Sequence, residues 1–116
     1  MINIIKKGNY NIYQLVIDNK EIGYVETIPN IDYLEITDVL IYEEYRGKGY
    51  SKELINYIFK NVKYNKIILE VSVNNHIAIS LYKKYGFKEI NIRKNYYRDG
   101  SDALIMEVQK WKMFIF

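Results

Sequence analysis

The order of strand-like and helix-like runs is the feature that most constrains the fold of this sequence. Runs rich in β-branched and aromatic residues, which favour strands, occupy residues 10–19, 21–28 and 33–42. A run with helical periodicity follows, and then come a strand-like run, a second helical run and two final strand-like runs at 87–97 and 102–109. This order predicts an α/β domain with a mixed sheet, in which the central strand–helix–strand unit is parallel.

A change of phase marks the third strand-like run. Leu34 and Ile36 occupy one face of a regular strand. Val39 and Ile41, further along the same run, occupy the other face. A change of phase inside one strand predicts a β-bulge, and bulges are often found beside active sites.

Both helical runs carry an apolar stripe. The first has Leu54, Ile58 and Val62 at four-residue spacing. The second has apolar residues at positions typical of one helix face, with Asn75 as its predicted N-cap and Gly86 where a C-terminal glycine is common. These runs are therefore expected to bury one face each against the sheet.

Composition excludes several classes of protein. The chain has 116 residues, of which 49% are hydrophobic and 27% are charged, and this favours a single folded domain with a real core. The net charge of +3 is small and scattered, so no nucleic-acid partner is expected. There is no cysteine and one histidine, His76, so neither a thiolate nucleophile nor a metal site is expected. No apolar run approaches the ~18 residues of a membrane helix, and we expect no membrane partner and a cytoplasmic protein.

Two glycines stand directly before the first helical run, in Arg-Gly-Lys-Gly-Tyr-Ser at residues 46–51. A helix N-terminus exposes unpaired N–H groups and the positive end of the helix dipole. Glycines allow a ligand to approach the backbone, and Arg46 and Lys48 add positive charge. The stretch fits a phosphate or pyrophosphate, but a solvated turn with incidental glycines fits this pattern equally well.

Two further side chains have both a structural and a chemical interpretation. Glu70 interrupts one face of the apolar run at 66–73, where a carboxylate is costly unless it is paired or hydrated. It is either a general base or a residue that faces solvent where the sheet opens. Tyr82 lies on the apolar stripe of the second helix, a place where tyrosine more often belongs to the core than to a catalytic site.

Two motifs resemble those of one enzyme superfamily. The stretch at 45–51 resembles the coenzyme A pyrophosphate motif Q/R-x-x-G-x-G/A of the GNAT N-acetyltransferases, with Ser51 where Gly or Ala is usual. Residues 75–87 resemble its second signature, N-x-x-A-x-x-L-Y-x-x-x-G-F, at every specified position. The chain is identified as a member of this superfamily, and it is most similar to the bacterial ribosomal-protein-alanine N-acetyltransferases (RimI type).

The resemblance implies a GNAT fold, which is a central mixed twisted sheet flanked by helices, and the parallel central strands of this sheet splay apart. It also implies acetyl-coenzyme A (acetyl-CoA) as cosubstrate and no metal. The implied coenzyme contacts are the backbone of one strand, the glycine turn with the start of the next helix, and one asparagine. They are Val39, Leu40, Ile41, Arg46, Gly47, Lys48, Gly49, Tyr50, Ser51, Lys52 and Asn75.

The resemblance also assigns catalytic roles. It implies that Glu70 is the general base, acting through a water molecule, and that Tyr82 donates a proton to the coenzyme sulfur. Tyr96 and Tyr97 match a segment that borders the acceptor groove. Without cysteine, direct attack in a ternary complex is favoured over a covalent intermediate. The expected acceptor is a primary amine, with a protein N-terminal α-amine preferred. A small amine (polyamine, antibiotic or amino acid) and a non-catalytic coenzyme-binding domain are the alternatives.

The ends of the chain depart from the superfamily pattern. Relatives usually have two helices before the first hairpin, and residues 1–8 leave no room for them. We therefore expect a single domain over residues 1–116 that lacks most of the N-terminal helical region. The tail at 111–116, Trp-Lys-Met-Phe-Ile-Phe, is costly to leave in water. It either packs on this chain, by extending the last strand or by filling the place of the missing helices, or forms a homodimer contact.

Overall fold

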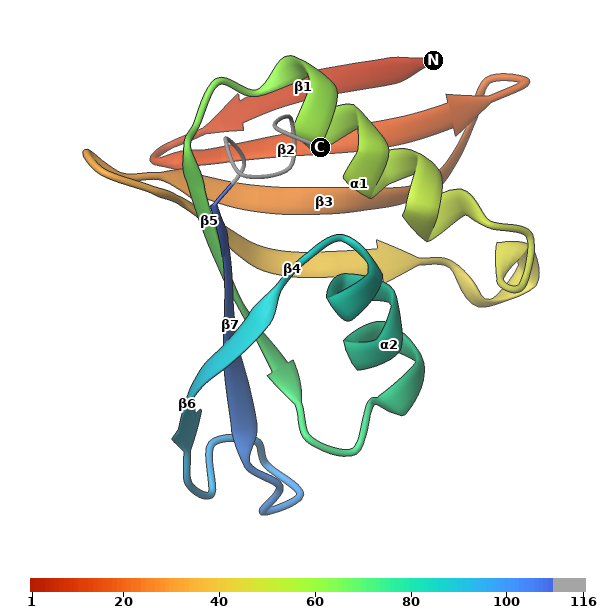
Figure 1. Ribbon diagram of the computed structural model, residues 1–116. Helices are drawn as coiled ribbons and strands as arrows, with labels where there is room; N and C mark the ends of the chain where they lie inside the picture. The colour runs from red at the N-terminus through yellow and green to blue at the C-terminus, as the bar shows by residue number, and fades with distance from the viewer. Residues whose placement is uncertain (110–116) are drawn as a thin grey trace. The chain divides into compact units, whose positions relative to one another are not determined.

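The computed structural model describes residues 1–109, so the predicted contacts of the tail at 111–116 lie outside the described residues. The chain divides into two compact units, Met1–Lys63 and Tyr64–Phe116. Their elements in chain order (Figure 1) are β1 (Ile2–Lys7), β2 (Tyr10–Ile17), β3 (Lys20–Pro29), β4 (Leu34–Ile41), the 3-10 turn η1 (Glu43–Tyr45), α1 (Tyr50–Asn61), β5 (Lys66–Ser72), α2 (His76–Lys84), β6 (Lys88–Arg93) and β7 (Ala103–Gln109).

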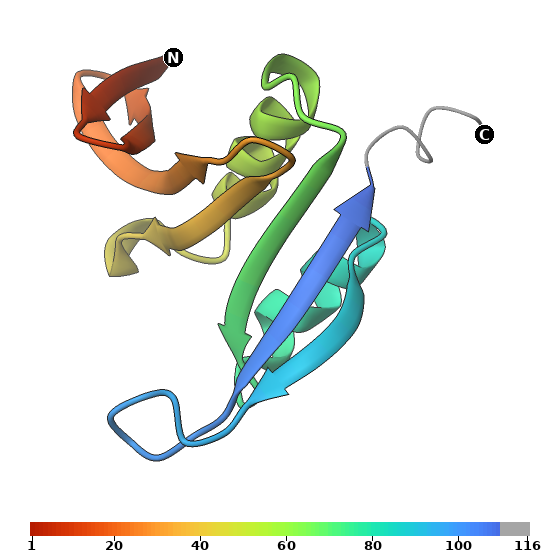
Figure 2. The ribbon, with the colours of Figure 1, turned by 90° about the vertical axis from the view of Figure 1, so that its left-hand side faces the viewer.

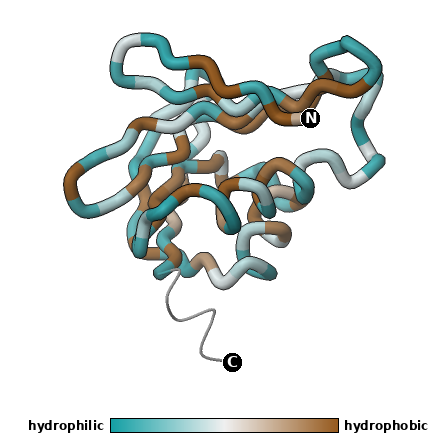
Figure 3. Tube along the Cα trace, turned by 90° about the horizontal axis from the view of Figure 1, so that it is seen from above, coloured by the Kyte–Doolittle hydropathy of each residue, from teal (hydrophilic) through white to brown (hydrophobic). Residues whose placement is uncertain are grey.

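The first unit is an antiparallel meander of β1, β2, β3 and β4, and α1 packs against β3 and β4 (Figure 1). The strand-like runs at 10–19 and 21–28 form an antiparallel hairpin of β2 and β3. Asp18 and Asn19 have φ angles of 50° and 63° in its turn, a left-handed conformation that Asn and Asp tolerate better than most residues. Hydrophobic and hydrophilic residues are interspersed along this unit (Figure 3). Every second residue is buried in parts of β2 (Tyr13 and Leu15) and β3 (Val25 and Thr27), as expected for a sheet with one buried face, whereas β1 has no buried residue.

The predicted bulge in β4 is confirmed, and Thr37 is its extra residue. Glu26 of β3 pairs with Asp38, and the next residue, Thr27, pairs with Ile36. The Thr37 hydroxyl donates to the Glu26 carbonyl oxygen and contacts its carboxylate, with oxygen–oxygen distances of 3.2 and 2.8 Å. The inserted residue places the apolar residues before and after it on the same face of the sheet.

The core of the first unit lies between α1 and the sheet. Leu54 and Ile58 of α1 are buried as the periodicity predicts, whereas Val62 is the half-buried C-cap residue. The rings of Tyr13 and Tyr57 join the sheet to the helix, with centroids 5.9 Å apart. Truncating a buried leucine such as Leu54 to alanine typically costs about 2–5 kcal/mol, so this layer contributes substantially to the unit's stability.

The second unit has three antiparallel strands in the order β5, β7, β6, with α2 on one face (Figure 2). Asn75 is the N-cap of α2, because its Oδ1 accepts a hydrogen bond from the backbone N of Ala78 at 3.2 Å. Gly86 follows the helix with φ of 91°. Both predictions for this helix are confirmed, and its buried Tyr82 joins the apolar residues of β5 and β7 in the core.

Three features differ from the elements predicted from sequence. The structure adds β1 at residues 2–7 and the turn η1. It ends β6 at Arg93, four residues before the predicted end of the strand, because Asn95 has φ of 50° and starts a loop. Residues 94–102 are therefore the β6–β7 loop, and this loop carries Tyr96 and Tyr97. The predicted splaying of parallel central strands and the predicted single domain stay predictions.

Candidate functional site

The glycine turn before α1 owes its two glycines to backbone conformation. Gly47 and Gly49 have φ angles of 78° and 81°, a region that residues with a Cβ rarely adopt. A Cβ atom at either position would meet nothing within 4 Å. Crowding inside the protein therefore does not explain these glycines; the turn requires their left-handed conformation and leaves its surface open to an approaching group.

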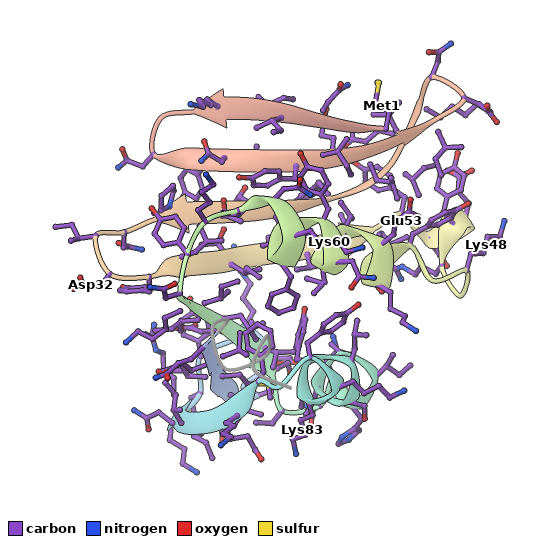
Figure 4. All side chains as sticks on the ribbon, turned by 45° about the horizontal axis from the view of Figure 1, so that its top comes forward. Met1, Asp32, Lys48, Glu53, Lys60 and Lys83 are labelled. Atoms are coloured by element: carbon purple, nitrogen blue, oxygen red, sulfur yellow. The ribbon has the colours of Figure 1, made fainter. Side chains whose placement is uncertain are left out.

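The N-terminus of α1 offers an anion site next to this turn. Gly49 is the N-cap residue and has no side chain, so no side-chain cap covers the first turn. Tyr50 and Ser51 are half-buried there, whereas Lys52 is exposed. Lys48 is exposed and points away from the ribbon at this end of α1 (Figure 4). An open backbone, a helix dipole and a nearby cation fit a phosphate group.

Arg46 joins the turn to the preceding strand. Its Nε donates a hydrogen bond of 2.8 Å to the carbonyl oxygen of Ile41, the last residue of β4. This contact brings together two of the predicted coenzyme-binding residues and gives Arg46 a structural role. Because it spans η1, it fixes the distance between the end of β4 and the glycine turn.

The predicted backbone contacts of β4 lie opposite a close approach of β3. Val39, Leu40 and Ile41 are half-buried and pair with Val25, Tyr24 and Gly23, respectively. A Cβ at Gly23 would lie 2.3 Å from the carbonyl oxygen of Leu40 and 2.9 Å from the Cα of Ile41. Gly23 thus sets the position of this part of β4. This close approach could have been recognised in the sequence, because a glycine inside a strand-like run often marks a place where two backbones come close together.

A hydrogen-bonded tyrosine lies beside the bulge of β4. The hydroxyl of Tyr24 donates to Oδ2 of Asp38 at 2.8 Å. Burial, the hydrogen bond and the negative charge of Asp38 raise the pKa of Tyr24 to about 12. The pair could not be predicted from the sequence, because it depends on the register of β3 and β4.

Glu70, the predicted general base, forms an ion pair in the second unit. Its Oε1 lies 3.0 Å from Nη2 of Arg93, and the two side chains are 25% and 52% exposed, respectively. The pairing explains how a carboxylate is tolerated in the middle of β5. Arg93, which lies on β6, was not among the residues predicted from the sequence.

The same cluster contains both predicted acceptor-groove tyrosines. The guanidinium carbon of Arg93 lies 4.9 Å from the ring centroid of Tyr96. The rings of Tyr96 and Tyr97 meet edge to face with centroids 5.1 Å apart. Burial raises the pKa of Tyr97, and the negative charge of Glu70 adds to the increase. The structure therefore brings Glu70, Tyr96 and Tyr97 together, with Arg93 among them.

The other predicted residues of this unit have clear structural environments. The Tyr82 side chain is 7% exposed, and its ring meets that of Phe87 edge to face at 5.6 Å. Asn75 uses its carboxamide oxygen to cap α2. Among residues 1–109, no group of three or more His, Cys, Asp or Glu side chains has the arrangement of a metal site. Neither helix in this range is long and apolar enough to cross a membrane.

These features define an α/β protein with an open, glycine-capped helix N-terminus in its first unit and an ion-paired carboxylate beside tyrosines in its second. The chain matches the model of the acetyltransferase (GNAT) family over residues 2–87. It is 34% identical to an N-alpha-acetyltransferase of Saccharolobus solfataricus, with 88% of this chain and 71% of the relative covered. It is 42% identical to a putative ribosomal protein bS18-alanine N-acetyltransferase of Bacillus subtilis, over 74% of this chain and 60% of the relative.

The fold agrees with these matches. The structure resembles the crystal structure of the ribosomal-protein-S18-alanine N-acetyltransferase from Escherichia coli with a TM-score of 0.83 and 28% identity, covering 90% of this chain and 71% of that chain. The chain thus spans 60% to 71% of the length of these three proteins. It belongs to the acetyltransferase (GNAT) family. The predicted fold class and the prediction of an acetyl-CoA-dependent N-acetyltransferase are confirmed.

Proposed function

We propose that this protein transfers the acetyl group of acetyl-CoA to the α-amine of a protein N-terminus. The observation that carries the proposal is the part-buried carboxylate of Glu70 beside Tyr97, a candidate base next to residues expected to border an acceptor. The names of the Saccharolobus solfataricus and Bacillus subtilis relatives support the choice of acceptor.

Residues of the first unit are proposed to bind the coenzyme. The amides and glycines of residues 47–52 fit its pyrophosphate, because the helix N-terminus is open and Lys48 adds positive charge. The backbone of Val39, Leu40 and Ile41 is proposed to contact the pantetheine, while Arg46 fixes the spacing of these two regions. Asn75 of the second unit is proposed as a further polar contact.

Residues of the second unit are proposed to move the protons. Acetyl-CoA supplies the thioester. Glu70 takes a proton from the acceptor ammonium, directly or through a water molecule, so that the nitrogen lone pair can form a C–N bond with the acyl carbon. As the C–S bond breaks, the hydroxyl of Tyr82 donates a proton to the leaving sulfur. Tyr96 and Tyr97 are proposed to line the path of the acceptor.

The test is thiol release from acetyl-CoA with a panel of N-terminal peptides and small amines. We expect turnover with peptides and a loss of about 10²–10⁴-fold in kcat for Glu70→Gln and for Tyr82→Phe, the usual range for removing a general acid or base. Turnover with small amines alone would assign a polyamine, antibiotic or amino acid as acceptor. Coenzyme binding without turnover on any acceptor would favour a non-catalytic binding domain.

Several features of the proposal rest on the sequence. A cytoplasmic location and the absence of nucleic-acid and membrane partners stay predictions. The homodimer contact through the tail at 111–116 lies outside the described residues.

A further inference from the structure

Arg93 reaches its partner across a whole strand. Glu70 lies on β5 and Arg93 on β6, and β7 runs between them. Glu70 and Asn91 both pair with Ile105 of β7, so their side chains share one face of the sheet, and Arg93, two residues after Asn91, lies on that face as well. Neighbouring strands are about 4.8 Å apart, so the Arg93 side chain crosses roughly 10 Å of sheet.

The local sequence makes this crossing feasible. The residue of β7 in register with Arg93 is Ala103, whose small side chain leaves room above β7. A long, extended side chain with a planar charged end can lie over such a position and still reach the next strand. The 3.0 Å contact with Oε1 of Glu70 is the result.

Arg93 is also held from its other side. Its guanidinium lies over the ring of Tyr96, with the guanidinium carbon 4.9 Å from the ring centroid, and this cation–π contact helps to hold the group in place. The backbone N–H groups of Tyr96 and Tyr97 donate to the carbonyl oxygen of Ser101 at 3.1 and 3.2 Å. The hydroxyl oxygen of Ser101 lies 3.3 Å from that of Ser72 at the end of β5, which joins the loop to the strand that carries Glu70.

Building on the proposed function, we propose that Arg93 is a positioning residue, held by Tyr96, that fixes the carboxylate of Glu70 for removal of the acceptor proton. An ion pair with a half-exposed arginine contributes little to folding stability. Its main effect is on orientation: a carboxylate held in one rotamer keeps its oxygen in line with the acceptor, and displacement by about 1 Å can cost about 100-fold in rate.

The test compares Arg93→Met and Arg93→Lys with a matched control. Lys83→Met breaks the Lys83–Glu89 ion pair of the same unit, which is 3.2 Å long with side chains 53% and 52% exposed. Lys83 lies on α2 (Figure 4) and has no place in the proposed chemistry. The measurements are kcat and KM for peptide and acetyl-CoA, with the melting temperature of each variant.

We expect Arg93→Met to lower kcat at least tenfold, with the KM for acetyl-CoA and the melting temperature unchanged. Arg93→Lys keeps the charge but loses the planar stacking group, so its kcat should fall between those of Arg93→Met and the parent. Lys83→Met should match the parent. If Arg93→Met fails to fold, Arg93→Gln, whose polar but shorter and uncharged side chain does not reach across β7 to Glu70, should lower kcat in the same way.

The outcomes separate this inference from the proposed function. No turnover by the parent with any acceptor overturns both. If the parent turns over and the folded Arg93 variants keep kcat within twofold of the parent, the positioning role alone is overturned. A second readout needs no turnover: in ¹⁵N-arginine spectra, the Arg93 Nη resonances should be resolved in the parent and averaged in Glu70→Gln. Resonances that are identical in both proteins would also contradict the inference.

Discussion

Replacing Gly23 by alanine tests how closely β3 must approach β4. The added Cβ would lie 2.3 Å from the carbonyl oxygen of Leu40, 2.7 Å from Cδ1 of Ile41 and 2.9 Å from the Cα of Ile41. Two of these atoms belong to the backbone, so a rotamer change of Ile41 cannot relieve the clash. The strands would have to move apart at the end of β4.

The magnitude follows from the kind of atoms involved. Overpacking by a methyl group typically costs about 1–3 kcal/mol, and we expect Gly23→Ala to reach the upper end, about 3 kcal/mol, because the backbone must move. Gly8→Ala is the matched control: Gly8 has φ of 60° and nothing within 4 Å of its Cβ position, so it tests conformational strain without a clash. Its expected cost is about 1–2 kcal/mol.

Urea denaturation followed by far-UV circular dichroism measures both variants. We expect a lower midpoint for Gly23→Ala than for Gly8→Ala, with similar slopes. Calorimetry should also show weaker acetyl-CoA binding for Gly23→Ala alone, because Leu40 and Ile41 belong to the proposed pantetheine contact. Equal unfolding free energies for Gly23→Ala and the parent would refute the reasoning, since no close approach could then exist.

Two further outcomes are expected. The pKa of Tyr24 is raised to about 12 in the folded protein, so folding favours the neutral form of its hydroxyl. The resulting contribution to the free energy of unfolding is complete below pH 10 and is lost as the pH rises from about 10 to 12. Tyr24→Phe should therefore flatten the fall in unfolding free energy over that range, and an unchanged slope would contradict a raised pKa of Tyr24. Asn75→Ala should cost about 1 kcal/mol by removing the cap of α2, and Asn74→Ala, measured in the same denaturation series, should cost distinctly less. Equal costs for the two asparagines would argue against the cap.

Structural features that depend on residues close together in the sequence were predicted. The bulge of β4 was visible as a change of phase, and the start of α2 was visible as Asn75 before an apolar stripe, because both are written in residues a few positions apart. The contact of Glu70 with Arg93 was not visible. It depends on the registers of β5, β7 and β6, which join residues 23 positions apart in the chain.

The end of β6 shows a second limit. Residues 87–97 were predicted as one strand, yet the strand stops at Arg93. Directly after it, Lys94 pairs with Asp102, and the backbone N of Asn95 donates to Oδ1 of Asp102. These contacts come from the other side of the loop, so composition alone did not reveal them. Their effect is to turn Tyr96 and Tyr97 out of the strand and into the cluster around Glu70.

The hydrogen bond between Arg46 and Ile41 has a consequence for which molecules the first unit can distinguish. It closes residues 41–46 into a ring, so the end of β4 and the glycine turn are kept at a set separation. A long cofactor that touches both regions gains from each contact without the cost of ordering the chain between them. A fragment that touches only one region, such as a thiol arm without its phosphates, loses the second contact and should bind more weakly than the whole cofactor.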